Sequence, residues 1–410
     1  MEADGWAQYI VADIAAPTRN ALVGGPFGSN LVQRDYTATG VPVIRGQNMG
    51  VGRWVGGDFV FVSEEKAQQL SPNTARPRDL VFTQRGTIGQ VALVPSDRFE
   101  RYIISQSQMK LTVDTSKADP IFLYYVFTSR EHQDYIGQNA IQTGVPHTNL
   151  EHLRTTPLRL PSLDEQRAIA HVLGTLDDKI ELNRRMNETL EAIAQALFKS
   201  LFADAVKNGL PEGWYQSTIG EEVSVVGGST PSTKEAEFWE YGTIHWATPK
   251  DLSSLDSPVL LDTERRITDA GLSQISSGLL PSGTVLLSSR APIGYLVISE
   301  VPVAVNQGFI AMVCDKELPN YYVRLWARSN MDLIKANANG TTFLEISKTN
   351  FRPLPVVVPS KSVLDDFIRV VEPLHRKVVT NLRESLTLGA LRDALLPKLI
   401  SGTLRVGSLN

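Results

Sequence analysis

Histidine, cysteine and carboxylate side chains build most catalytic and metal sites, and in this 410-residue chain they are scattered. The six histidines stand at positions 132, 147, 152, 171, 245 and 375, and the one close pair, His147 and His152, falls in a predicted loop. The single cysteine, Cys314, excludes an intrachain disulfide. No nucleophile, base and orienting group can be assembled at a spacing typical of catalysis. We therefore predict neither a catalytic site nor a metal site.

Cofactor and enzyme motifs are also missing from the sequence. It contains no GxxxxGK(S/T) phosphate loop, no GxGxxG after a predicted strand, no HExxH zinc motif and no (D/N/S)PP(Y/F/W) motif of adenine methyltransferases. The formal net charge of −4 lacks the basic excess that is usual in nucleic-acid binders, so such contacts would need local patches or a basic partner. The lone cysteine, and the absence of a signal pattern or a long apolar run, predict a cytoplasmic protein.

The elements that would position any site occur twice, because the chain is a tandem repeat. Matching stretches keep their order while the offset drifts between 197 and 208 residues, as a duplication with small insertions would give. The matches are DGW at 4–6 with EGW at 212–214, VGG at 23–25 with VGG at 226–228, QRGTIG at 84–89 with SRAPIG at 289–294, LYYV at 123–126 with NYYV at 320–323, and PLRLPS at 157–162 with PVVVPS at 355–360.

Each half has the same predicted anatomy. Short apolar runs beside glycine-containing turns indicate strands, and one helix follows a proline near 120–136 and again near 319–335. A long polar helix closes each half. The predicted fold is α+β, with two tandem pseudo-symmetric α/β domains separated by two long antiparallel coiled-coil spacer helices. The predicted boundaries are 1–160 and 207–360 for the domains, and 161–206 and 361–410 for the spacer segments.

The long helices, near 163–204 and 362–400, carry apolar residues mostly at alternating spacings of four and three. This 3.5-residue repeat predicts a coiled-coil seam, although an ordinary surface helix is the alternative. The first seam comprises Ile169, Leu173, Leu176, Ile180, Asn183, Asn187, Leu190, Ala194, Leu197 and Leu201. The second comprises Phe367, Val371, Leu374, Val378, Asn381, Ser385, Leu388, Leu391, Leu395 and Leu399.

Asparagines interrupt both seams near the middle. If the helices pair antiparallel with full overlap, Asn183 and Asn187 fall beside Asn381, where hydrogen bonds between them would fix the register. The alternative is that each amide faces water. Residues 161–204 carry five basic and eight acidic side chains, and residues 361–410 carry eight and five, so the helices should attract each other. About 35 paired residues would make a rod of roughly 50 Å that holds the two domains apart.

Several stretches resemble the specificity (S) subunit of type I restriction–modification enzymes. LPSLDEQRAIAHVLGTLDDKIELNRRMNETLEAIAQALFKSLF at 160–202 is similar to that family's central spacer, and LPEGW at 210–214 is similar to the entry of its second recognition domain. LRDALLPKLISGTLRV at 391–406 looks like its C-terminal signature. In the first half, ADGW stands where LPEGW would be expected. The resemblance covers the whole chain in order.

The resemblance implies a non-catalytic, DNA-binding subunit. Each domain of such a subunit reads one half of an asymmetric bipartite DNA site, and the helical spacer sets the gap. Two methyltransferase subunits, which methylate adenine N6 from S-adenosylmethionine, and restriction subunits, which use ATP and magnesium, would be partners. No cofactor would bind this chain itself. Phe198, Leu201 and Phe202 are predicted to be exposed apolar positions for partner docking.

Base readout needs forked or amide side chains on exposed loops, and both halves offer them. The candidates in the first half are Ser29, Asn30, Gln33, Arg34, Arg45, Gln47, Asn48, Gln84, Arg85, Thr143 and His147. Those in the second half are Ser229, Thr230, Lys234, Thr248, Lys250, Ser289, Arg290, Thr341 and Thr342.

Structural roles compete with readout for several of these positions. Arg85 and Arg290 recur at equivalent places, so each could form a structural ion pair or clamp a phosphate. Gln106 and Gln307 lie in strand-like runs and are weaker candidates. Glycines at 24–25 and 227–228 are predicted to form turns, and the YYV helices are predicted to be core.

Two other functional classes compete with a DNA-reading adaptor. One is a scaffold that joins protein partners without touching DNA, and the other is an enzyme such as a restriction–modification fusion. Specific protection of a bipartite DNA site would exclude the first. The missing motifs argue against the second.

Overall fold

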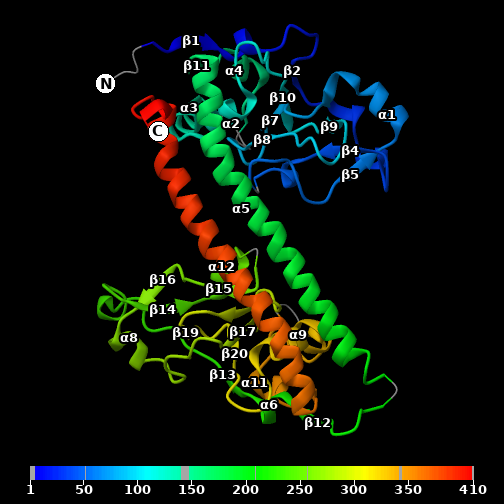
Figure 1. Ribbon diagram of the computed structural model, residues 1–410, viewed down its shortest axis with the longest axis vertical. Helices are drawn as coiled ribbons and strands as arrows, with labels where there is room; N and C mark the ends of the chain where they lie inside the picture. Colours follow the sequence, from blue (N-terminus) through cyan, green and yellow to red (C-terminus); the bar gives the residue numbers. More distant parts are fainter. Residues whose placement is uncertain are drawn as a thin grey trace. The chain divides into compact units, whose positions relative to one another are not determined.

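The chain folds into two compact units, and each of them includes a segment of both long helices (Figure 1). The structure is a computed structural model that describes residues 5–50, 52–139, 147–207, 209–255, 257–340 and 344–408. The first unit comprises residues 1–182 and 384–410, and the second comprises residues 183–383. Each unit therefore combines one globular α/β part with a piece of both long helices.

The described part of the first unit contains a four-stranded sheet, a five-stranded sheet and a two-stranded ribbon. The four-stranded sheet is antiparallel, with the order β2 (Leu22–Gly24), β10 (Gln108–Leu111), β7 (Leu80–Thr83) and β8 (Val91–Leu93). The five-stranded sheet has the order β3 (Tyr36–Thr37), β5 (Val60–Val62), β4 (Val41–Ile44), β9 (Tyr102–Ile104) and β6 (Thr74–Ala75), and its β4–β9 pair is parallel. The ribbon pairs β1 (Ala7–Ile10) with β11 (Pro157–Leu160).

The helix predicted near 120–136 is two helices, α2 (Pro120–Thr128) and α3 (Arg130–Asn139). Ser129 between them is extended, with ψ near 150°, and its hydroxyl donates to the carbonyl of Val126 at 2.7 Å. Such local side-chain bonds to the backbone compete with helix continuation. The apolar face of α2, including Phe122 and Phe127, packs on the sheet around β8 as core. The unit's other short helices are α1 (Glu64–Gln69) and α4 (Leu150–Thr155).

The second unit repeats this topology, as the duplicated sequence predicts. Its ribbon pairs β12 (Tyr215–Thr218) with β21 (Pro355–Val358). Its largest described sheet has the order β13 (Ser224–Val226), β20 (Phe309–Val313), β17 (Val285–Ser288), β18 (Leu296–Ser299) and β15 (Val259–Leu260). A third sheet orders β16 (Arg265–Ile267), β14 (Ile244–Ala247) and β19 (Val303–Val305), and β14 runs parallel to β19 just as β4 does to β9.

The helices of the second unit also correspond to those of the first. The predicted helix near 319–335 is again divided, at Asn330, into α9 (Asn320–Ser329) and α10 (Met331–Ala336). The remaining short helices are α6 (Ile219–Glu222), α7 (Pro249–Ser253), α8 (Asp269–Ser273) and α11 (Lys348–Phe351). Tyr322 and Val323 of α9 are core residues, as the sequence predicts.

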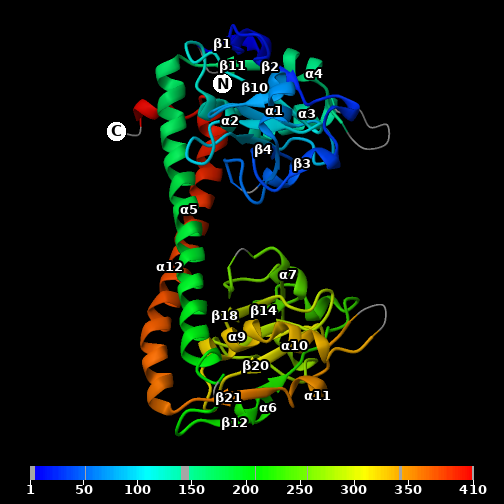
Figure 2. The ribbon, with the colours of Figure 1, turned by 90° about the vertical axis from the view of Figure 1, so that its right-hand side faces the viewer.

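The long helices α5 (Leu163–Phe198) and α12 (Lys361–Ile400) lie antiparallel within each unit, and Figure 2 shows them side by side. In the first unit, Asp177 accepts from Arg392 at 2.7 Å and Lys179 lies 3.0 Å from Glu384. These pairs match the opposite charges of the two segments. The predicted seam positions are buried or half-buried except Leu201 and Leu391, which are 39% and 47% exposed.

The α5 seam ends early because a π-turn, Lys199–Ala203, changes the phase of the helix. This turn directs Phe202 into the core of the second unit, where it packs edge-to-face against Tyr322 and Phe367 with ring centroids 4.9 and 5.0 Å away. Phe198 and Phe202 are each 3% exposed. The prediction that both are exposed docking positions is therefore wrong, whereas Leu201 does face solvent.

The asparagines of the seam are hydrogen-bonded to one another within the second unit. Asn183 and Asn381 are fully buried, and Asn187 is 8% exposed. The side-chain amide of Asn381 donates to Oδ1 of Asn187 at 2.8 Å, and the amide of Asn183 donates to the backbone carbonyl of Asn381 at 3.3 Å. The layer therefore joins α5 and α12 through directional bonds, which apolar side chains at these positions would not supply.

Buried arginines attach the long helices to the globular parts. In the second unit, Arg324 of α9 is 4% exposed and donates to both carboxylate oxygens of Glu191 in α5 at 2.8 Å. In the first unit, Arg53 pairs with Asp178 of α5 and donates to the hydroxyl of Tyr125 at 3.1 Å. Burial raises the pKa of Tyr125, so its hydroxyl keeps the proton that it donates to Asp177. Each helix segment is thus fixed to its own globular part.

Candidate nucleic-acid interface

The backbone makes the same hydrogen bonds after β7 in the first unit as it does after β17 in the second. In the first unit, Gln84 donates its backbone N–H to Ser107 at 2.6 Å and accepts from Thr148 at 3.0 Å. In the second unit, Ser289 donates to Gly308 at 2.8 Å and accepts from Ile346 at 3.0 Å. The next residues, Arg85 and Arg290, form isolated bridges with His147 and Glu345. The repeat therefore places Gln84–Arg85 and Ser289–Arg290 at equivalent positions.

The side chains on this shared frame differ. Arg85 is exposed, and in the described part of the chain no ion pair is found for it. Arg290 lies 3.6 Å from Glu345, with both side chains partly exposed at 39% and 47%. Such an exposed pair is worth little and can be exchanged for a phosphate. Ser289 is 3% exposed and its hydroxyl has no hydrogen-bond partner among the described residues, whereas Gln84 is only half-buried.

A glycine-rich loop follows β2 in the first unit and β13 in the second. Each loop lies against the chain segment just before the neighbouring strand, which is β10 in the first unit and β20 in the second. A Cβ atom on Gly25 would stand 2.0 Å from the carbonyl oxygen of Ser105, and one on Gly228 would stand 1.6 Å from that of Val305. Both positions thus require glycine for close approach of two backbones, rather than for a turn as the sequence suggested.

Equivalent glutamines hold these loops in place. The amide of Gln106 donates to the carbonyl of Leu31 at 2.8 Å and also to that of Gly28. In the second unit, Oε1 of Gln307 accepts from the hydroxyl of Thr230 at 2.7 Å. The glutamines therefore order the loops that carry candidate contact residues, a role that their strand-like sequence context did not reveal.

An open hollow in the first unit gathers part of the predicted set. Asn30, Gln84 and Arg85 line it together with the glycine-rich loop. Asn73, Asn149 and Arg154 line the same hollow and were missed by the sequence analysis, because they lie on helix ends and turns far away in the chain. Asn149 caps α4, a local pattern that could have drawn attention to it.

The other candidates of the first unit lie in varied surroundings. Ser29, Gln33 and Arg34 are exposed, and Gln47 is exposed although its amide donates to Asp58 at 3.3 Å. Arg45 is half-buried and lies over the ring of Tyr36. Asn48 is 3% exposed, and its amide donates to the carbonyls of Gly56 and Asp58 at 3.0 and 2.9 Å. Asn48 thus organises its own loop, and Thr143 lies outside the described residues.

In the second unit, most candidates already have partners inside the protein. The hydroxyl of Ser229 donates to Gln274 at 3.2 Å, and that of Thr248 donates to Asp251 at 2.6 Å at the start of α7. Lys250 contacts Glu264 at 2.8 Å, which raises the pKa of its ammonium. Lys234 is exposed, and Thr341 and Thr342 lie outside the described residues.

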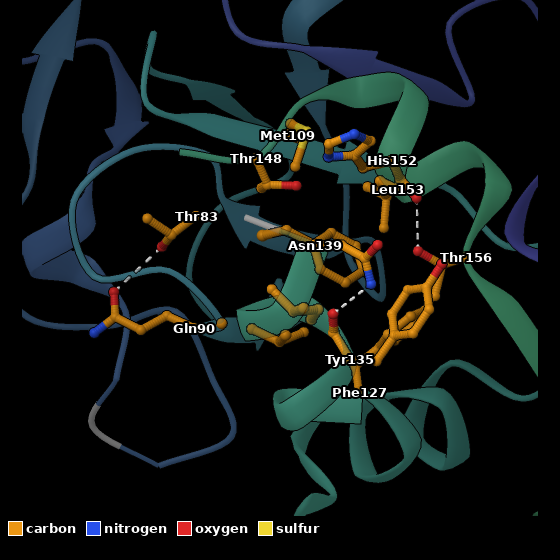
Figure 3. A pocket seen from close by; sticks show the side chains of 14 residues that line it. Thr83, Gln90, Met109, Phe127, Tyr135, Asn139, Thr148, His152, Leu153 and Thr156 are labelled. Carbon is orange, nitrogen blue, oxygen red and sulfur yellow. Dashed lines mark hydrogen bonds between the residues drawn. The ribbon is translucent and has the colours of Figure 1, made fainter. Parts of the chain in front are cut away.

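A second hollow in the first unit is small (Figure 3). Phe127, Tyr135 and Leu153 line it together with polar groups such as Thr148 and His152. Its volume of about 30 Å³ suits about two water molecules and is far below the roughly 300–1,000 Å³ of small-molecule sites. A flipped nucleobase would not fit there.

Metal-ligating side chains do not form a cluster in the described residues. No three histidine, cysteine, aspartate or glutamate side chains in that part of the chain are placed to share a metal ion. Burial raises the pKa of the Cys314 thiol to about 12, which leaves it protonated at neutral pH. None of the helices among these residues has the length and apolar character needed to cross a bilayer.

The two α/β units match in topology, and each includes segments of both antiparallel long helices. Their loops have equivalent backbone positions but different side chains. These features define a duplicated recognition protein. The model of the type I restriction modification DNA specificity domain matches residues 41–192 and 211–377, and the chain belongs to this family. Both copies of the repeat are therefore specificity domains.

Known proteins that match most of the chain agree with this assignment. The specificity subunit of the type I restriction enzyme MjaIX from Methanocaldococcus jannaschii is 24% identical over 85% of this chain and 82% of its own. The HindI specificity subunit of Haemophilus influenzae is 24% identical over 79% and 86%. The crystal structure of the type I S subunit from M. genitalium shares the fold, with a TM-score of 0.60, 18% identity and 96% coverage of both chains.

Proposed function

We propose that this chain is the DNA-reading subunit of a type I restriction–modification complex, and that each unit reads one half of an asymmetric bipartite site. The proposal rests on one observation: equivalent backbone positions in the two units carry different side chains. Gln84 and Arg85 occupy in the first unit the places that Ser289 and Arg290 occupy in the second. Gln84 is half-buried and can reach a base, whereas Ser289 is only 3% exposed, so equivalent places offer DNA different groups and the two half-sites should not be symmetric.

The proposed interface of the first unit is the hollow that Asn30, Gln84 and Arg85 line, extended by the exposed side chains on either side of it. In the second unit it is the surface around Ser229, Thr230 and Arg290, with Lys234 and Lys250 as phosphate contacts. Base edges are read by amide and guanidinium groups, while lysines position the backbone. Thr143, His147, Thr341 and Thr342 complete the proposed set. Asn48 we assign to loop structure rather than contact.

The proposed domain boundaries remain 1–160 and 207–360, with spacer segments at 161–206 and 361–410. We propose that the spacer sets the number of unread base pairs, and that Asn183, Asn187 and Asn381 fix its register. Their directional hydrogen bonds support this role, because sliding one helix by a turn would leave buried amides without partners. Lengthening both helices by the same number of heptads should widen the gap and leave each half-site unchanged.

We propose that the chemistry belongs to partners. Two methyltransferase subunits would methylate adenine N6 with S-adenosylmethionine, and restriction subunits would use ATP and magnesium to cleave DNA in the cytoplasm. The chain itself is a non-catalytic subunit, as members of its family are. The net charge of −4 supports this division, since partners must supply much of the phosphate neutralisation.

Reconstitution tests the proposal directly. The complex of this chain with its methyltransferase subunits should protect a bipartite site whose sequence is given by methylome sequencing of cells that carry both. Exchanging residues 1–160 for the equivalent domain of a relative should change one half-site alone. Two rival functions give different results: a protein scaffold would protect no specific DNA, and an enzyme would transfer methyl groups when incubated alone.

A further inference from the structure

An almost bare aromatic ring stands on the glycine-rich loop of the first unit. Phe27 is 89% exposed, and among the large apolar side chains of the described residues only Tyr241, at 97%, is more exposed. The next, Leu386, is 63% exposed. A ring on a flexible loop would fold back on nearby apolar surface, so what holds this loop matters.

The loop is held on both sides of the ring. Gly25 donates its N–H to the carbonyl of Gln108 at 2.8 Å, and the backbone there packs so closely that no side chain fits. Beyond the ring, Asn30 donates to the carbonyl of Phe27 itself at 3.0 Å, and Gln106 binds Leu31 and Gly28. These contacts present the ring to solvent as a fixed projection.

The surroundings of the ring suit a nucleic-acid duplex. Phe27 lines the hollow that also contains Asn30, Gln84, Arg85 and Arg154. Glu151 lies there too, but it is paired with Arg154 at 3.5 Å. The ring is therefore an apolar group among amide and guanidinium donors, which is the setting in which proteins insert side chains between base pairs.

The second unit lacks this feature. Counting from the equivalent glycines Gly25 and Gly228, the position of Phe27 is taken by Thr230, whose hydroxyl bonds to Gln307. The two loops have equivalent backbone positions, but only the loop of the first unit carries an exposed aromatic ring at this position. Any distortion of DNA by this ring would be confined to one half-site.

We propose that Phe27 inserts partway between two stacked base pairs of the half-site read by the first unit. The inference rests on the proposed function and adds a second means of selection, since flexible pyrimidine–purine steps unstack more readily than others. Specificity at that step comes from deformability and not from hydrogen bonds. The second half-site is read without such a wedge.

The test uses the complex of this chain with its methyltransferase subunits and duplexes carrying 2-aminopurine at successive positions of the first half-site. Fluorescence should rise at one step other than the methylated adenine, because unstacking relieves quenching. Phe27→Ala should abolish that rise and weaken binding about tenfold, whereas Phe27→Trp should retain it. The alanine variant should fold normally, since the ring is almost fully exposed.

Tyr241→Ala, which removes the most exposed aromatic side chain among the described residues of the second unit, is the matched control and should leave the first half-site signal unchanged. A wild-type complex that protects its site without any such rise, or a rise that Phe27→Ala keeps, overturns the wedge alone. Loss of methyltransferase subunits from the Phe27→Ala complex, with unaltered fluorescence, would assign the ring to a protein contact and also overturn it. A wild-type complex that protects no bipartite site contradicts the proposed function itself.

Discussion

The buried ion pair between Glu191 of α5 and Arg324 of α9 gives the sharpest prediction about how a long helix is held to its globular part. Glu191 accepts two hydrogen bonds at 2.8 Å from a guanidinium that is 4% exposed, and a third, longer one from Arg328 at 3.4 Å. Glu191→Ala would leave the Arg324 charge buried without its partner. Removing one member of a buried pair costs about 3–5 kcal/mol of unfolding free energy.

For a unit of this size, each kcal/mol lowers Tm by about 2–4 °C, so the second unit should melt roughly 6–20 °C earlier. Differential scanning calorimetry of the full chain measures this. Glu188→Ala is the matched control, because Glu188 lies one turn away on the same helix and pairs with Arg184 while 60% exposed. Its expected loss is under about 1 kcal/mol.

A double variant separates the pair from its surroundings. Replacing Glu191 and Arg324 together with methionine removes both charges, and such replacements of buried pairs are often neutral or stabilising. The double variant should therefore recover most of the stability lost in Glu191→Ala. Equal melting temperatures for Glu191→Ala and Glu188→Ala, or a double variant no more stable than the single one, would refute the reasoning.

Three further predictions concern other sites. Gly228→Ala should destabilise the second unit by at least about 2 kcal/mol in urea unfolding, because its Cβ would lie 1.6 Å from the carbonyl of Val305 and the backbone must shift. The hydrogen bond from His375 lowers the pKa of Glu300 below its usual 4.5, so the stability contributed by Glu300 is complete above pH 4.5 and is lost as the pH falls through the lower, folded value. The Tm difference between wild type and Glu300→Gln should therefore shrink below pH 4.5. Arg85→Ala should weaken DNA binding by the complex by about 1–3 kcal/mol and relax one base preference, and unchanged affinity and preference in binding assays would retire that contact.

Duplication and periodicity in the sequence were enough to predict the architecture. Collinear repeats predicted two copies of one topology, and the 3.5-residue spacing predicted two long helices that pair with opposite charge. These features are periodic or duplicated, so they can be read without knowing any long-range contact. The same reasoning placed Gln84–Arg85 and Ser289–Arg290 at equivalent positions, which the backbone hydrogen bonds bear out.

Which side chains are available for contact became clear only from the folded chain. Asn48 looked like a reader but is buried by contacts with residues 56 and 58, and Phe202 looked like a docking residue but turns into the core after a π-turn. Gln106 holds the loop that carries Phe27, and no sequence motif had identified Phe27 as exposed. Exposure and hydrogen-bond partners depend on segments brought together by folding, and local residue patterns carry no record of them.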